Sequence, residues 1–165
     1  MHRPHCIVTA LAAVWSLIAT AGAMADGVPA NDDCAAATVI AAVPFSADVD
    51  TTPATLAGTD PTLCDGAGQG GHSVWYSFTP AQNGLMRIET FSSNYDTVVG
   101  VFEGTCASPV LDACNDDFAG ARTSEAFFQA HAATPMLIEV AGFVGTTRPP
   151  DNGQLHLSLD RQEYG

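Results

Sequence analysis

Two short segments of the sequence carry residues that are typical ligands of hard cations. Asp96 follows Asn94 and directly precedes a β-branched run, and Asn115, Asp116 and Asp117 follow a second such run. Carboxylate and amide oxygens at strand ends suit Ca²⁺, which accepts about six to eight oxygen ligands in irregular geometry. We therefore interpret Asp96, Asp116 and Asp117 as candidate calcium ligands. The alternative is a set of Asx turns, in which the same side chains accept hydrogen bonds from nearby backbone amides.

Three aromatic residues are candidates for a ligand-binding surface. Trp75 and Tyr95, together with Phe118, could stack against sugar rings, which would make the chain a carbohydrate-binding module. Aromatic side chains of β-sandwiches also fill the core or pair across strands. Both interpretations of Trp75 and Tyr95 stay open on the sequence alone.

The sequence offers little for catalysis. His72 precedes Ser73, but the Gly-x-Ser-x-Gly pattern of a nucleophile elbow is absent. His131 and His156 lie far away along the chain, on separate predicted elements. We expect no catalytic residue and no enzyme activity, and we keep a small secreted hydrolase that uses His72 or His131 as an alternative function.

Four cysteines remain after the first 25 residues, namely Cys34, Cys64, Cys106 and Cys114. An even number in an exported protein predicts two disulfides. Three pairings are possible. We favour Cys106–Cys114, because the Ser-Pro segment between them can turn, and this leaves Cys34–Cys64. A zinc site is the competing interpretation, but the chain has no Cys-x-x-Cys pair.

Residues 1–25 have the pattern of a cleavable signal peptide. Arg3 gives a short basic start, an apolar run covers residues 6–21, and Ala23-Met24-Ala25 is a small-x-small cleavage motif. We predict cleavage after Ala25 and a single domain over residues 26–165. The apolar run is short for a bilayer span, and no later segment is apolar enough for one. The expected location is therefore the periplasm or the external medium.

The chain is strongly acidic. It holds 18 Asp and Glu against 5 Lys and Arg, a formal charge of −13, and removal of residues 1–25 takes away only Arg3 and gives −14. Such a surface repels nucleic acid and anionic lipid. It suits cations or simply solubility, so we expect a partner that is a protein or a polysaccharide rather than a nucleic acid.

Hydrophobic alternation and turn residues predict an all-β domain of about nine short strands. Residues 155, 157 and 159 show the alternation most clearly, with leucine at each. The predicted strands cover residues 38–43, 45–50, 73–79, 85–91, 97–102, 110–114, 126–129, 136–140 and 153–159. This spacing, with two disulfides, favours an antiparallel β-sandwich of the jelly-roll kind.

One helical turn is expected at residues 34–37, with Asn31 or Asp32 as its N-cap. The acidic run that Asn31 opens is a second, weaker candidate for a cation, but a helix cap explains it more simply.

Four ordered segments resemble a known exported module. They are Asn-Asp-Asp-Cys-Ala-Ala-Ala at 31–37, Ser-Val-Trp-Tyr-Ser-Phe-Thr-Pro at 73–80, Asn-Tyr-Asp-Thr-Val-Val at 94–99 and Cys-Asn-Asp-Asp at 114–117. In order and spacing they are similar to the bacterial pre-peptidase C-terminal domain and its relatives, over about residues 31–159. Each motif is weak alone, and the ordered set is the specific signal.

The resemblance implies a jelly-roll-like β-sandwich without catalytic activity, found beside secreted proteases and other exported enzymes. It implies roles in secretion, attachment to a substrate or surface, and calcium-dependent stabilisation. In such a fold the segments of Asp96 and of Asp116 and Asp117 lie on adjacent strands, so the resemblance also implies that their carboxylates converge.

Overall fold

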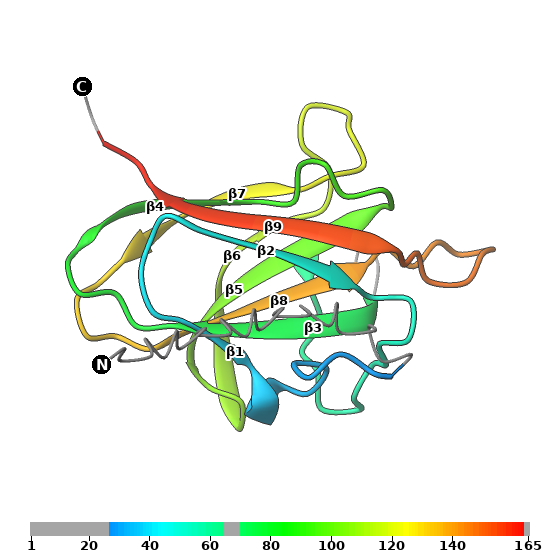
Figure 1. Cartoon of the computed structure of the whole chain (residues 1–165), viewed down its shortest axis with the longest axis horizontal. Coiled ribbons are helices and arrows are strands. Elements are labelled where there is room, and N and C mark those ends of the chain that lie inside the picture. The colour runs from blue at the N-terminus through cyan, green and yellow to red at the C-terminus, as the bar shows by residue number, and fades with distance from the viewer. Residues whose placement is uncertain (1–26, 65–69, 164–165) are drawn as a thin grey trace, which may run out of the picture.

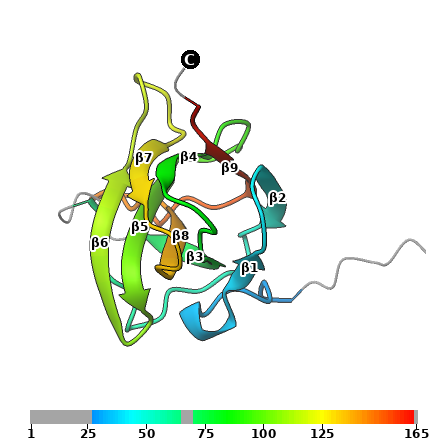
Figure 2. The same cartoon turned by 90° about the vertical axis from the view of Figure 1, so that its left-hand side faces the viewer.

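The computed structural model describes residues 27–64 and 70–163, and the predicted cleavage site after Ala25 lies outside them. Two β-sheets face each other across an apolar core (Figure 1), so the predicted all-β sandwich is confirmed. Seen from the side, β6 and β7 close one flank of the sandwich and β2 lies at the opposite flank (Figure 2).

The first sheet has five strands in the order β1-β3-β8-β5-β6. Their bounds are Thr38–Ile40, Gly71–Phe78, Met136–Gly142, Thr97–Thr105 and Ser108–Asn115. The second sheet has four strands in the order β2-β9-β4-β7. Their bounds are Phe45–Asp50, Gln154–Arg161, Gly84–Glu89 and Glu125–Ala130. All strand pairs are antiparallel except β1 with β3.

All nine predicted strands are present; residues 45–50 coincide with β2, and the other strands have shifted ends. The first strand stops at Ile40 rather than residue 43, and the predicted turn is a 3-10 turn, η1, at Cys34–Ala36. The predicted cap is wrong, because Asp33 occupies the cap position and makes no side-chain cap bond. Asn31 instead donates from Nδ2 to the Trp75 carbonyl at 2.9 Å, and Asp32 accepts hydrogen bonds from Thr55.

The core between the sheets follows from strand alternation. Val74, Tyr76 and Phe78 point inward from β3, and Leu155, Leu157 and Leu159 point inward from β9. These residues are buried, as the alternation predicts for one face of each strand. The inner faces of both sheets therefore form one continuous apolar layer.

A second apolar cluster covers the outer face of the five-stranded sheet. It contains Trp75, Val98, Phe102 and Leu137, with Leu63 lying over them. A Cβ at Gly100 would come within 2.4 Å of a Leu63 methyl carbon, so only glycine admits this close approach. The segment that carries Leu63 thus covers this face, and the central strands β3, β5 and β8 are largely buried on both faces.

The disulfide pairing differs from the prediction. Cys34 bonds Cys106 and Cys64 bonds Cys114, rather than Cys106 bonding Cys114. The segment after Cys106 forms β6 instead of a loop, and eight extended residues separate two Cα atoms by about 26 Å. A disulfide requires Cα atoms within about 7 Å, so this short pairing is excluded. Both bonds instead tie the N-terminal half to the β5–β6 hairpin.

We predict that non-reducing peptide mapping of the oxidised protein will recover Cys34–Cys106 and Cys64–Cys114. The double variant C64S/C114S should lose about 2–5 kcal/mol of unfolding free energy, because the bond closes a loop of 50 residues. Denaturant unfolding measures the loss. A peptide that joins Cys106 to Cys114, or a double variant as stable as the parent, would contradict the pairing.

Glu139 is buried in the outer cluster. It is 1% exposed, and its register partners in the sheet are Trp75 and Gly100. Oε2 of Glu139 has no hydrogen-bond partner among the described residues. Burial, followed by the nearby charge of Asp60, raises the pKa of Glu139 to about 9. The carboxyl group is therefore held neutral at physiological pH.

This burial predicts a pH dependence of stability. The folded state binds the Glu139 proton more tightly than the unfolded state, so the stabilisation is complete below the ordinary pKa of 4.5 and is lost as pH rises toward 9. Glu139→Gln should raise Tm more at pH 8 than at pH 5. Thermal melts of both proteins at the two pH values check this, and an equal change at both would contradict the burial argument.

Candidate metal centre

The candidate site lies where β5 begins and β6 ends. Asp96 directly precedes β5, and Asp116 and Asp117 directly follow β6. The two strands are antiparallel neighbours, with Val99 opposite Asn115, so these ends are adjacent. One carboxylate oxygen from each aspartate lies within 4.8 Å of the others. The structure thus brings together the three residues that the sequence singled out.

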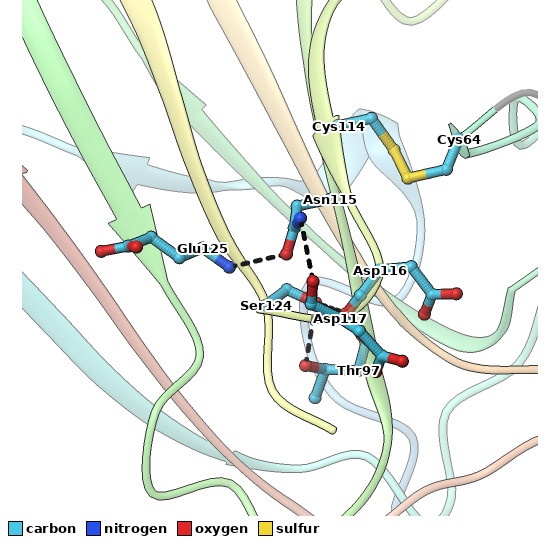
Figure 3. The surroundings of a disulfide bond; sticks show 8 residues. All are labelled: Cys64, Thr97, Cys114, Asn115, Asp116, Asp117, Ser124 and Glu125. Atoms are coloured by element: carbon cyan, nitrogen blue, oxygen red, sulfur yellow. Dashed lines mark hydrogen bonds between the residues drawn. A yellow bond between two sulfur atoms is a disulfide. The ribbon is translucent and has the colours of Figure 1, made fainter. Parts of the chain in front are cut away.

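Hydrogen bonds hold the loop after β6 in place. Oγ of Ser124 lies 2.6 Å from the Thr97 carbonyl and also within hydrogen-bond distance of the Asp116 carbonyl. The Asn115 side chain accepts from the Glu125 amide at 3.0 Å and donates to the Asp117 carbonyl at 3.3 Å. These bonds fix the backbone on both sides of the cluster, as Figure 3 shows.

The Cys64–Cys114 disulfide adds a covalent anchor next to the cluster (Figure 3). Cys114 precedes Asn115, so the bond restrains the end of β6 just before the two aspartates. The strand end therefore has limited freedom to move away and relieve the repulsion between carboxylates.

Two carboxylate oxygens in the cluster are buried and lack partners. Asp96 is 8% exposed, and its Oδ1 atom, like Oδ1 of Asp116, has no hydrogen bond from any described residue. Oδ2 of Asp96 accepts from Nη2 of Arg148 at 3.0 Å, and the same nitrogen lies 3.1 Å from Asp151. Arg148 therefore compensates one oxygen of Asp96 and leaves the other without a donor among the described residues.

The proton affinities reflect this crowding. Burial, with the negative charges of Asp117 and Asp96, raises the pKa of Asp116 to about 6. Burial also raises the pKa of Asp96. The negative charges of Asp117 and Asp151 raise it further, and together these effects outweigh the lowering effect of Arg148. Raised carboxyl pKa values mean that additional positive charge at this position is favoured.

The donor set fits a hard divalent cation. Three carboxylates offer oxygen ligands only, which suits Ca²⁺ better than Zn²⁺, since zinc sites are usually built from cysteine and histidine. The Asx-turn alternative applies to Asn115, whose side chain bonds nearby backbone. Within the described residues, no backbone amide donates to the carboxylates of Asp96, Asp116 or Asp117.

The candidate aromatic surface is not present. Trp75 is 1% exposed and lies against Phe102 in the outer cluster, with ring centroids 6.1 Å apart. Tyr95 is 7% exposed and belongs to the core between the sheets. In this structure neither ring is exposed for ligand stacking, because Trp75 lies in the outer cluster and Tyr95 in the core between the sheets. Phe118 is partly exposed and packs against Phe91 instead.

The residues named for a hydrolase are also dispersed. The Ser73 side chain is buried, and its Oγ atom donates to Asp60 at 2.8 Å, so it is not an accessible nucleophile. His156 lies on the outer face of β9, with Nδ1 2.7 Å from a carboxylate oxygen of Asp48. His131 lies after β7 and is exposed.

Sequence reasoning missed the loop between β8 and β9. Arg148 and Asp151 reach the cluster from 52 and 55 positions after Asp96, and no periodic pattern marks them. The only sequence signal was scarcity, because Arg148 is one of four basic residues after the first 25. An isolated arginine in so acidic a chain is a reasonable candidate partner for a buried carboxylate.

Comparison with known proteins gives no assignment, since no protein-family model and no curated protein matches the chain. In the described part of the chain, no helix has the length and apolar character needed to cross a membrane. The two disulfides indicate an oxidising, extracytoplasmic environment.

In the metal-free protein we predict that Asp116 titrates near pH 6. NMR of the side-chain carboxyl carbon in EDTA measures this pKa directly. At a pH above the ordinary pKa of the carboxyl group, a pKa that is raised in the folded state destabilises that state. Asp116→Asn should therefore stabilise the metal-free protein at pH 7.5 and have less effect at pH 4. A pKa near 4 for Asp116, with no gain for the variant, would show that the carboxylates do not crowd one another.

Proposed function

We propose that this protein is an exported, non-catalytic β-sandwich module that binds Ca²⁺ through Asp96, Asp116 and Asp117. The observation that carries the proposal is the convergence of one carboxylate oxygen from each of the three aspartates within 4.8 Å, together with the buried Oδ1 atoms of Asp96 and Asp116, which lack partners among the described residues. Buried carboxylate oxygens without donors are costly, and a cation would compensate them.

Strand order supports a jelly roll. The eight strands β2 to β9 form two four-stranded layers in the orders β2-β9-β4-β7 and β3-β8-β5-β6, and β1 extends the second layer. This interleaving is the arrangement of a double Greek key. It agrees with the resemblance to the pre-peptidase C-terminal domain, which we retain as a proposed family relationship.

Calcium would act on stability and local order. An ion held by the three aspartates would bridge the start of β5 and the end of β6 and offset their mutual repulsion. The loop from Asp116 to Ser124 would then be fixed at both ends, by the ion and by the Ser124 hydrogen bonds. In a calcium-poor compartment the same loop would open more readily.

The biological role we propose is accessory: attachment to an extracellular protein or polysaccharide, or support of a separately encoded secreted enzyme, in the periplasm or medium. The two disulfides and the charge of −13 suit such an environment. With Trp75 and Tyr95 buried, we do not propose a carbohydrate platform on those residues.

We predict that millimolar Ca²⁺ will raise Tm relative to EDTA. A ligand at a hundredfold its Kd stabilises a protein by about 2.7 kcal/mol, which is a rise of roughly 5–10 °C for a domain of this size. Differential scanning calorimetry measures the shift, and calorimetric titration measures binding directly.

Two controls separate a site from general charge screening. Mg²⁺ and NaCl of matched ionic strength should raise Tm less than Ca²⁺. Asp116→Asn should remove most of the calcium shift, whereas Glu163→Gln, which removes one exposed charge near the C-terminus, should keep it. Equal shifts with all cations, or a full calcium shift in Asp116→Asn, would disprove the site.

A further inference from the structure

The strand β2 forms an open edge of the four-stranded sheet. Among the described residues its one strand partner is β9, and its other edge lies at the flank of the sandwich (Figure 2). An open edge presents unpaired backbone donors and acceptors to any extended chain that can reach it. The backbone groups of β2 that are not bonded to β9 are the ones that this edge presents.

The register identifies these groups. The Thr51 amide donates to the Gly153 carbonyl, which continues the β2–β9 ladder and marks odd-numbered residues of β2 as bonded to β9. The N–H and C=O groups of Ser46, Asp48 and Asp50 therefore point to the open edge. No described residue forms a hydrogen bond with these backbone groups.

A pocket of about 610 Å³ lies against this edge. Asp48, Val49 and Asp50 all line it. Side chains of consecutive strand residues point to opposite faces, so a pocket that all three line reaches the edge of the strand, and at the end of β2 it extends to Gln154 of β9. Its other wall is the segment before η1, where Val28 and Pro29 add apolar surface, and Pro53 closes one end.

The two sides of this edge differ in chemistry. Val49 faces the core between the sheets, while Asp48 and Asp50 face outward and are exposed. One oxygen of Asp48 pairs with His156, which leaves its second oxygen without a partner among the described residues. Asp50 accepts from the Thr52 amide and also interacts with the side chains of Thr52 and Gln154, so its charge is exposed but more fully hydrogen-bonded. A strand laid along β2 would therefore meet carboxylates on one face and apolar groups on the other.

The charge distinguishes between occupants. A second copy of this chain would place its own Asp48 and Asp50 against the same residues, and like charges across a strand pair are destabilising. A basic segment would meet attraction both from these two carboxylates and from a chain of net charge −13.

We propose that the open edge of β2 binds an extended peptide segment of a partner protein in which basic and apolar residues alternate. The segment adds a fifth strand to the sheet, bonds to the backbone of Ser46, Asp48 and Asp50, and directs its basic side chains to the two carboxylates. The inference goes beyond the proposed calcium function and shares no residue with the metal cluster.

The probe is a capped peptide of about ten residues that alternates Lys and Val, with an alternating Glu and Val peptide as its counterpart. Hydrogen exchange of the exported protein, followed by NMR at physiological salt, should show the Ser46, Asp48 and Asp50 amides slowed at least about tenfold by the Lys peptide. The Ala47 and Val49 amides, already bonded to β9, should change little. Absence of protection at the three even-numbered amides would overturn the proposal.

Matched variants separate strand addition from general attraction. Asp48→Asn should weaken binding about fivefold through the lost charge, and Asp48→Pro should weaken it about fivefold further, because proline removes only an amide that points to the open edge. Asp112→Asn, an exposed charge loss on β6, should leave binding nearly unchanged. Equal losses in Asp48→Asn and Asp112→Asn, equal binding of the Glu peptide, or dimerisation through β2 without peptide would each refute it.

Discussion

Two disulfides that both end on the β5–β6 hairpin govern how the outer face of the five-stranded sheet is covered. The covering segments are η1 and the loop that ends at Leu63, and within the described residues neither contains a strand. Loops of 72 and 50 residues are costly to hold closed by packing alone, so the covalent bonds remove much of that entropy from the unfolded state. The burial of Trp75 and Glu139 depends on this cover.

The same constraint reaches the candidate metal centre. Carboxylates at strand ends normally avoid one another by small backbone movements into solvent. Here Cys114 is covalently held beside Asn115, and Ser124 fixes the chain after Asp116. The aspartates remain close because these restraints limit the backbone movements that would separate their carboxylates. A cation at this cluster would thus complete an arrangement that the disulfide and the Ser124 bonds already impose.

The strands were predictable because alternation is a local property, and Leu155 to Leu159 show it without any knowledge of neighbours. The acidic cluster was predictable because its members lie at strand ends. The disulfide pairing was not, since it depends on whether the residues after Cys106 turn or extend. The burial of Trp75 was missed for a related reason. It depends on a long-range contact, because the loop that carries Leu63 packs over this sheet, and no local sequence pattern predicts that contact.

The edge strands of the two sheets determine where this sandwich can form backbone hydrogen bonds with another chain. On one flank β6 and β7 lie side by side, so each partly shields the other (Figure 2). On the other flank β1 is only three residues long and offers little backbone for pairing, whereas β2 presents six residues beside an apolar pocket. The two exposed carboxylates on β2 discourage pairing with another copy while leaving its backbone accessible to a basic strand. Selectivity at this edge therefore arises from charge, and affinity from backbone bonds and the apolar wall.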